Sequence, residues 1–281
     1  MAEGYDRYIF REVDHFAPAQ IFDCGQCFRW TEEADGSWTG VAGNCLANVK
    51  AVPSSSGRPG KVDVTVEGSG TEMFWRNYLD LDPDYGEMSG ILMRGEPEIM
   101  PVACRAGQGI RILRQDFWEA TLDFIISQNN NIPRIRGCIE KLSEKFGKPL
   151  GEFRGEERYG LPCPETLAEL NRSDLSDIHL GYRDEYIIKT ASMWLDMTEE
   201  ERSASVIDFP GIGPKVESCI RLFGLHEMDA FPIDVWVARL MNRFYGFDEK
   251  DKKGMKAFAE EKFGDLAGLA QQYLFYFIRG L

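Results

Sequence analysis

Two residues in the C-terminal third of the chain combine a possible nucleophile with a carboxylate. Lys215 follows a short glycine-rich segment, FPGIGP at 209–214, and Asp234 opens the next amphipathic stretch. A primary amine can attack an electrophilic sugar carbon, and a neighbouring carboxylate can stabilise cationic character that develops on that sugar. The amine must be uncharged to attack, so we expect surroundings that disfavour the ammonium through desolvation or nearby positive charge.

The elements around this pair can bring its two side chains together. Pro214 suits the first turn of a helix, because its missing N–H costs nothing there. A helix over 215–224 is roughly 15 Å long, and the segment 225–233 can reach about 30 Å when extended. Taken singly, a lysine near a helix start is usually a solvated charge, and an aspartate is a common N-cap.

The glycine-rich segment itself is typical of a tight hairpin that binds phosphate. Gly211 and Gly213 lack a Cβ, so the backbone can turn sharply and approach another molecule closely. The free N–H groups of the hairpin lie at a helix N-terminus, which favours an anion. An amine and a carboxylate over such a hairpin indicate chemistry on a nucleotide sugar.

Composition describes an ordinary globular protein with one feature that opposes this interpretation. The chain has 281 residues, with 43% hydrophobic and 28% charged side chains, so it can bury one large core or two smaller ones. Its formal net charge is −14. Bulk acidity repels phosphate, so binding to nucleic acid must depend on a local basic face.

Cysteine usage and the N-terminus favour a reducing, cytoplasmic location. Seven scattered cysteines do not suggest a disulfide framework, and Cys24 and Cys27 form a C-x-x-C with no second pair. No cluster of four closely spaced cysteines follows the hairpin, so we expect no iron–sulfur cluster. The first residues lack a signal-peptide pattern, and no apolar run is long enough to span a membrane.

Hydrophobic periodicity predicts an α+β fold in two parts. Residues 1–85 alternate like an antiparallel sheet with accompanying helix, whereas 86–281 are predicted to be almost entirely helical. The expected strands are 27–31, 38–41, 46–52 and 62–66. The expected helices are 71–79, 139–146, 164–172, 184–197 and 199–206. A further helix is expected to begin with a capping box at Asp116 and Glu119, and the hairpin unit and a final helix follow later in the chain. Residues 151–164 are expected to form a connecting loop.

Several segments together resemble one enzyme family. FDCGQCFRW at 22–30, ISQNNNIPRIRG at 126–137, LGYRDEY at 180–186 and AQQYLF at 270–275 follow one another in the order found in 8-oxoguanine DNA glycosylases. With the FPGIGPK hairpin, the chain resembles a bifunctional glycosylase and AP lyase of the helix-hairpin-helix superfamily. The resemblance implies a helix-hairpin-helix domain, duplex DNA containing 8-oxoguanine as partner, a monomeric protein and no cofactor.

The resemblance also implies how the damaged nucleotide is extruded. An enzyme that acts on a base must take it out of the stack. Tyr182 would wedge into the stack, Asn129 would fill the vacated space, and Arg134 and Arg183 would read the orphaned cytosine. Judged from the residues alone, the QNNN segment also fits a polar helix terminus, and Tyr182 also fits a half-buried core aromatic.

Four further residues would form the base pocket in this resemblance. Phe275 would stack on one face of the flipped base, Cys219 would lie near the other, and Gln271 would bind the Watson–Crick edge. The Gly25 carbonyl would accept from the N7–H of the damaged base and repel the bare N7 acceptor of guanine. Cys219 and Phe275 also occupy apolar helical positions, where most residues are core.

Catalysis would follow the same pattern, with one departure. Lys215 would form a Schiff base that permits β-elimination, and Asp234 would stabilise the sugar. Backbone carbonyls at Ile207, Phe209 and Ile212 would hold a cation that bridges to a phosphate. Trp236 stands where the eukaryotic enzymes carry a phosphate-binding histidine, which favours the bacterial branch and puts that contact in doubt.

Two alternatives remain open at this stage. A helix-hairpin-helix glycosylase for alkylated or mismatched bases shares the hairpin, but its monofunctional members lack the lysine. A non-enzymatic DNA-binding module would use the hairpin only as a phosphate clamp, and would need neither the facing Lys215 and Asp234 nor a stacking pocket.

Overall fold

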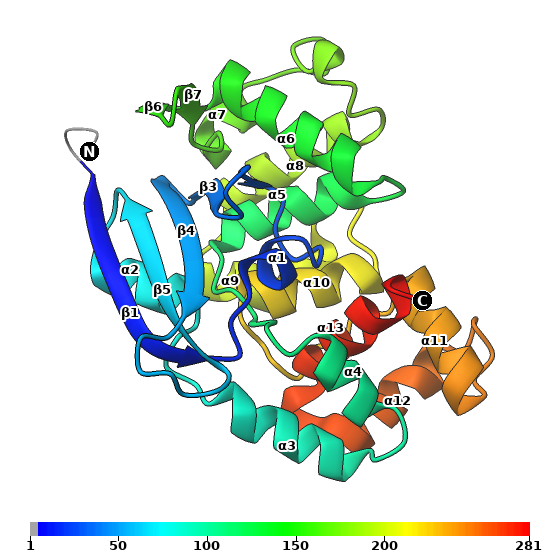
Figure 1. Cartoon of the computed structure of the whole chain (residues 1–281). Coiled ribbons are helices and arrows are strands. Elements are labelled where there is room, and N and C mark those ends of the chain that lie inside the picture. Colours follow the sequence, from blue (N-terminus) through cyan, green and yellow to red (C-terminus); the bar gives the residue numbers. More distant parts are fainter. Residues whose placement is uncertain (1–4) are drawn as a thin grey trace.

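The computed structural model describes residues 5–281 and pairs an N-terminal sheet with a larger helical body (Figure 1). The sheet is antiparallel, with strand order β1-β5-β4-β3-β2. Its strands are β1 (Asp6–Asp14), β2 (Trp30–Glu32), β3 (Trp38–Ala42), β4 (Cys45–Pro53) and β5 (Lys61–Gly68). Helices α1 (Pro18–Phe22) and α2 (Glu72–Tyr78) accompany it. The α+β prediction is therefore confirmed.

The sheet has its own aromatic core, which explains why so short a region folds against the helices. Phe22 of α1 stacks on Trp30 with ring centroids 4.1 Å apart, and Trp30 donates its indole N–H to the Tyr78 hydroxyl at 3.0 Å. Trp75 is also fully buried there. Aromatic packing of this kind buries a large area per residue.

The helical body packs around the second, larger core (Figure 1). Its helices are α3 (Tyr85–Gly95), α4 (Met100–Ala106), α5 (Phe117–Ser127), α6 (Ile132–Phe146), α7 (Pro164–Ala168), α8 (Arg183–Leu195), α9 (Glu199–Ala204), α10 (Pro214–Gly224), α11 (Val235–Tyr245), α12 (Lys252–Phe263) and α13 (Ala267–Arg279), with short 3-10 turns at η1 (Ser176–Ile178), η2 (Val206–Asp208) and η3 (Gly264–Leu266). Helix α5 packs against α10, and α13 packs against α4 and α11. Among the described residues, no helix is long and apolar enough to cross a membrane.

Three local predictions were wrong. The expected loop at 151–164 contains a hairpin, β6 (Pro149–Phe153) paired with β7 (Glu156–Tyr159), because its Arg154-Gly155 turn allows both residues a positive φ. The helix expected at 139–146 begins at Ile132, since the Asn131 side chain caps it by accepting from the Arg134 amide at 3.1 Å. The sequence pattern also missed β1 as a separate strand, where a bulge between Phe10 and Val13 interrupts the alternation.

The predicted capping box at the start of α5 is only half formed. Asp116 accepts from the Glu119 amide at 2.9 Å, as expected of an N-cap. The Glu119 carboxylate, however, accepts from the Gly43 amide at 2.9 Å, in the turn between β3 and β4. Glu119 therefore joins the sheet to the helical body.

Contacts across the predicted boundary at 85/86 are close. The buried Gln26 side chain donates to the Arg111 carbonyl at 2.9 Å and accepts from the Leu113 amide at 2.8 Å. These bonds hold the loop of residues 23–28, which includes Gly25, against the helical body. The division into 1–85 and 86–281 stays a prediction.

Candidate active site

The helices α10 and α11 bring Lys215 and Asp234 to one cavity. Lys215 lies in the first turn of α10, and Asp234 is the N-cap of α11, where its carboxylate accepts from the Val237 amide at 2.8 Å. Both residues line a cavity of about 430 Å³. The loop between the two helices thus returns the chain as the sequence predicted.

The surroundings of Lys215 are partly apolar. Its amine lies 5.4 Å from the centroid of the Phe124 ring, and the side chain is half-buried. Burial raises the pKa of the Asp234 carboxyl, and the Val237 amide and the Lys215 charge partly offset that rise. Burial likewise raises the pKa of the Cys219 thiol, again against the effect of Lys215. The amine, the carboxylate and the thiol therefore form one electrostatic cluster.

The four predicted pocket residues also meet. Gly25, Cys219, Gln271 and Phe275 line a narrow slot of about 40 Å³, together with Lys215 and Asp234. Cys219 and Gln271 are buried, and Phe275 is half-buried. Cys219 is thus both a packed residue and a wall of the slot, so its two interpretations are compatible.

The conformation of Gly25 depends on glycine. Its φ is +81°, in the left-handed region that L-residues seldom adopt. A Cβ there would lie 3.6 Å from the Phe275 ring, which is ordinary contact. Backbone conformation rather than crowding therefore requires glycine at the position predicted to present the discriminating carbonyl.

The two hairpin glycines have different surroundings. Gly211 has a φ of +79°, and a Cβ there would overlap the Tyr186 ring. Gly213 is the N-cap of α10, with a φ of −103° and nothing within 4 Å of an added Cβ. Gly211 is therefore required by the fold, whereas the space beside Gly213 is free for an approaching molecule.

Asn129 and Tyr182 lie together at the surface. The Asn129 amide donates to the Tyr182 hydroxyl at 3.1 Å, and Tyr182 packs edge-on against Tyr186 at 5.5 Å. Tyr182 is 43% exposed, which argues against a core aromatic. Asn129 has a φ of +46°, while Asn131 is the helix cap already described. The QNNN segment therefore forms a helix terminus and also carries an exposed amide.

The two arginines that are predicted to read the cytosine differ in how firmly the rest of the chain holds their side chains. Arg134 is exposed and donates to the His179 carbonyl at 3.1 Å. Arg183 is buried, and its guanidinium donates to the carbonyls of Gln128, Asn129 and Leu180. Arg183 thus fixes the loop that carries Asn129, whereas Arg134 can reach a ligand more freely.

Sequence reasoning missed several residues that line the cavities. Phe124 faces Lys215, and the Gln272 side chain donates to the Gln271 oxygen at 2.9 Å, which leaves the Gln271 amide nitrogen free of that bond. Arg279 lines the wider cavity, as does Trp236, which the sequence had singled out only in connection with a phosphate contact. Neither Phe124 nor Gln272 carries a chemical signal in the sequence, because both follow the helical apolar or polar pattern of their neighbours.

The predicted cation ligands are backbone atoms of η2 and the hairpin. The Phe209 carbonyl accepts from the Ile212 amide at 3.1 Å. Ile207 is the middle residue of η2, and its side chain is exposed. No group of three metal-binding side chains occurs within residues 5–281. A cation held by the carbonyls of Ile207, Phe209 and Ile212 stays a prediction.

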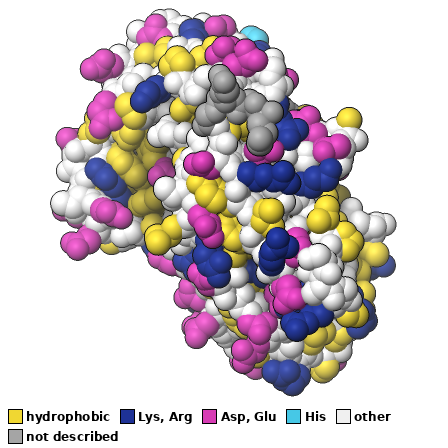
Figure 2. All heavy atoms as spheres, turned by 60° about the vertical axis from the view of Figure 1, so that its left-hand side comes forward, with side chains coloured by type: hydrophobic (Ala, Val, Ile, Leu, Met, Phe, Trp, Pro, Cys, Tyr) yellow, Lys and Arg dark blue, Asp and Glu magenta, His cyan; other side chains and the backbone are white. Residues whose placement is uncertain are grey.

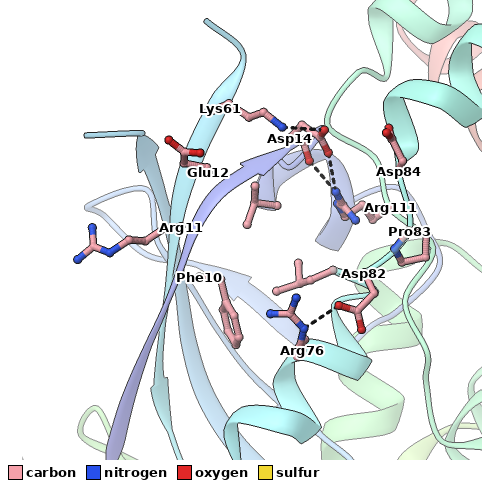
Figure 3. Close-up of a pocket in the computed structure, with 12 residues that line it drawn as sticks. Phe10, Arg11, Glu12, Asp14, Lys61, Arg76, Asp82, Pro83, Asp84 and Arg111 are labelled. Carbon is pink, nitrogen blue, oxygen red and sulfur yellow. Dashed lines mark hydrogen bonds and ion pairs between the residues drawn. The ribbon is translucent and has the colours of Figure 1, made fainter. Parts of the chain in front are cut away.

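A second cavity, of about 290 Å³, lies between β1 and the segment after α2 (Figure 3). Its cations are already paired: Asp14 bonds to Lys61 at 2.9 Å and to Arg111 at 3.1 Å, and Arg76 bonds to Asp82 at 2.7 Å. Acidic and basic side chains are interspersed over this side of the molecule (Figure 2). A paired set of this kind does not form a phosphate-binding surface.

Two protein-family models match the chain. The model for the 8-oxoguanine DNA glycosylase N-terminal domain matches residues 8–121, and the model for the HhH-GPD superfamily base excision DNA repair protein matches residues 122–264. The 8-oxoguanine glycosylase/lyase of Clostridium acetobutylicum, solved with duplex DNA containing cytosine opposite 8-oxoG, is 36% identical, with a TM-score of 0.88, over 99% of this chain and 98% of that one.

Two further relatives agree. The structure of MBOgg1 in complex with a low-affinity DNA ligand is 36% identical, with a TM-score of 0.89, over 98% of this chain and 96% of that one. The N-glycosylase/DNA lyase OGG1 of Arabidopsis thaliana is 28% identical over 90% of this chain and 75% of its own length. The chain belongs to the HhH-GPD superfamily of base excision DNA repair proteins, among its 8-oxoguanine DNA glycosylase/lyases.

Proposed function

We propose that this protein excises 8-oxoguanine, preferably opposite cytosine, from duplex DNA through a Schiff base on Lys215, and then nicks the strand. The observation that carries the proposal is the convergence of Lys215, Asp234, Gly25 and Phe275 on adjoining cavities. An amine, a carboxylate, an exposed backbone and a stacking ring are the groups that excision of a flipped purine needs.

Each group has a defined part in the reaction. The uncharged Lys215 amine attacks C1′, the bond from C1′ to the base breaks, and the base leaves with the bonding electron pair. Asp234 lies beside Lys215 and stabilises the positive character that develops on the sugar. The burial that raises the pKa of Asp234 also reduces solvent screening, which strengthens this interaction.

The lyase step follows from the same nitrogen. The nitrogen loses one proton, and as the C1′–O4′ bond breaks its second proton is transferred to O4′, which opens the sugar and gives an imine between C1′ and Lys215. Removal of a C2′ proton then expels the 3′ phosphate, and water releases the lysine from the product. These steps require proton transfers only, so no redox cofactor is invoked.

Recognition involves both strands. Phe275 and Cys219 enclose the flipped base, the Gly25 carbonyl accepts from its N7–H, and the Gln271 amide binds its Watson–Crick edge. Tyr182 wedges into the stack, Asn129 fills the space that the flipped base vacates, and Arg134 reads the cytosine on the other strand. Arg183 joins that recognition only if its guanidinium leaves the carbonyls that it now binds.

The partner is duplex DNA, and the protein acts as a monomer within the cytoplasm. A single chain supplies every residue assigned above, so the reaction requires no second subunit. Amides of the hairpin at Gly211 and Gly213 would seat a phosphate, with or without a cation bridging from the carbonyls of η2.

Borohydride trapping tests the chemistry. Wild-type protein incubated with duplex containing 8-oxoguanine opposite cytosine, then reduced, is expected to form a covalent complex that maps to Lys215. Lys215→Gln should lose trapping and strand cleavage yet still bind lesion duplex. A crosslink at another lysine, or cleavage retained by Lys215→Gln, would refute the assignment.

Opposite-base preference has its own test. Cleavage should be faster opposite cytosine than opposite adenine, and Arg134→Ala should reduce that ratio. Equal rates for the two pairings in the wild type, unchanged in Arg134→Ala, would remove Arg134 from recognition.

A further inference from the structure

Arg279, the last residue of α13, links the stacking ring to a distant loop. Its guanidinium carbon lies 5.4 Å from the centroid of the Phe275 ring. Its Nη1 donates to the Asp23 carbonyl at 3.2 Å. The side chain also lines the wider cavity beside Lys215. One exposed arginine therefore contacts the Phe275 ring and the loop that carries Gly25.

The loop that Arg279 binds carries Gly25. Asp23 follows α1 and precedes Gly25 by two residues, and its carboxylate pairs with Arg136 of α6 at 3.0 Å. The loop is thus held through the Asp23 side chain by α6 and through the Asp23 carbonyl by α13. The bond to the Asp23 carbonyl orients the Asp23–Cys24 peptide plane, which enters the segment that carries Gly25.

We propose that Arg279 is a positioning residue that holds the Gly25 carbonyl in register with the Phe275 ring and so sets the preference for the damaged base. The inference rests on the proposed function. A guanidinium is suited to this task because its planar fork can donate to a carbonyl while its face lies over a ring. The ammonium of lysine cannot make both contacts in the same geometry.

A plain phosphate contact is the competing role for an exposed arginine at a DNA-binding cavity. Such a contact would strengthen binding to any duplex, and lysine would replace it well. Positioning of the base slot matters only while a base is present. The two roles therefore separate on a substrate that already lacks its base.

The experiment compares two activities of Arg279→Ala in single-turnover conditions. Excision of 8-oxoguanine opposite cytosine should fall by about tenfold or more, since small misplacements in a site are costly. β-Elimination at a preformed abasic site, which needs Lys215 but no base slot, should stay within about twofold of wild type. Retained β-elimination also shows that the variant is folded.

Three further variants sharpen the result. Arg279→Lys should remain defective in excision, whereas a phosphate contact would be rescued. Arg136→Ala removes the other anchor of Asp23 and should show the same selective loss. Arg202→Ala is the matched control, because Arg202 also donates to a carbonyl, of Trp194 at 2.8 Å, and lies 5.0 Å from that ring, outside the cavities.

The outcomes separate this inference from the proposed function. Equal losses in excision and β-elimination, rescue by lysine, or unchanged excision in Arg279→Ala would overturn the positioning role while leaving the proposed function intact. A wild-type protein that does not excise 8-oxoguanine would refute the proposed function itself.

Discussion

Two groups of ionisable residues lie against different faces of α5. One group borders the candidate active site, and the other joins the sheet to the helical body. On one face, Phe124 lies below Lys215 at the cavity that also contains Asp234. Elsewhere on the helix, the buried Glu119 and Asp123 lie at the junction with the sheet. Burial raises the pKa of Asp234, raises the pKa of Glu119 to about 7, and raises the pKa of Asp123 well above its usual value.

The two groups differ in what surrounds the carboxyls. Asp234 borders a cavity and lies beside the Lys215 amine. At the junction, burial is the main cause of both raised pKa values; the Glu119 charge further raises the pKa of Asp123, and the Arg29 charge lowers the pKa of both carboxyls. Glu119 bonds to the Gly43 amide, and neither Asp123 oxygen has a hydrogen-bond partner within the described chain. A raised carboxyl pKa therefore marks burial, and access to a ligand is what makes such a group a catalytic candidate.

The largest expected effect follows from Asp234→Asn. Asparagine keeps an N-cap oxygen for the Val237 amide, so the free energy of unfolding should change by less than about 1 kcal/mol. The lost negative charge should slow excision by roughly 10²–10³-fold. Single-turnover excision and urea unfolding measured on the same preparation check both parts. A variant with normal excision, or one that loses activity only because it unfolds, would break the contrast with Glu119.

The proximity of Lys215 and Asp234 was predictable because the spacing of the segment is local. Lys215, Asp234 and the hairpin glycines lie in one helix-hairpin-helix segment, where helix length and loop reach limit the geometry. Gly25 and Phe275 lie at opposite ends of the chain, so only the resemblance could pair them. Their connection through Arg279 has no sequence signal, since an arginine near a helix C-terminus is common.

The junction group shows what local patterns misassign. Asp116 and Glu119 have capping-box spacing, yet Glu119 binds an amide more than seventy residues away in sequence, Gly43. The pattern at Asp123 is that of a polar position on an amphipathic helix, but the sheet covers it. Both carboxyls are buried by tertiary packing, which the helical periodicity of the local sequence does not reveal.

Glu119→Gln should change stability rather than activity. Burial places the pKa of Glu119 at about 7 in the fold against an ordinary value of 4.5, so between those values the folded state binds protons more tightly than the unfolded state. The free energy of unfolding of the wild type should therefore fall as pH rises through that window. Glutamine keeps an acceptor for Gly43 and should raise stability at pH 8 by about 1–3 kcal/mol, with little gain at about pH 4.5.

Urea unfolding at several pH values checks this prediction. Glu260→Gln on the exposed side of α12 is the control, and it should leave the pH profile of the wild type unchanged. Excision by Glu119→Gln at neutral pH should match the wild type within about twofold. Parallel pH profiles for Glu119→Gln and wild type would show that Glu119 does not lower stability as pH rises.

The two hairpin glycines are expected to differ in role, Gly211 in stability of the fold and Gly213 in binding of the ligand. Gly211→Ala should lower the free energy of unfolding by about 1–2 kcal/mol, because of its positive φ and the Tyr186 ring. Gly213→Ala should leave stability within about 0.5 kcal/mol of wild type, since its Cβ meets open space. The same methyl should weaken duplex binding several-fold, on the order of 1 kcal/mol. Equal stability losses in the two variants, measured by urea unfolding, would contradict the division.

The smallest expected effect concerns how a chain of net charge −14 binds DNA. The exposed Arg239 lies one turn along α11 from the 40%-exposed Trp236, with its guanidinium 5.3 Å from that ring. We expect Arg239 to supply the phosphate contact that Trp236 cannot. Arg239→Ala should therefore reduce the slope of log affinity against log salt concentration by the amount that about one phosphate contact contributes. Affinity at fixed salt should fall only a few-fold, about 1 kcal/mol.

Titration of lesion duplex at several salt concentrations measures this slope. Arg76→Ala is the matched control, because Arg76 is exposed but already paired with Asp82 beside the second cavity. Its loss should leave the slope unchanged if DNA binds on the Lys215 side alone. If Arg239→Ala leaves the salt slope unaltered, the basic contact lies elsewhere. If Arg76→Ala lowers the slope by the same amount as Arg239→Ala, DNA also reaches the sheet side, where acidic and basic side chains alternate.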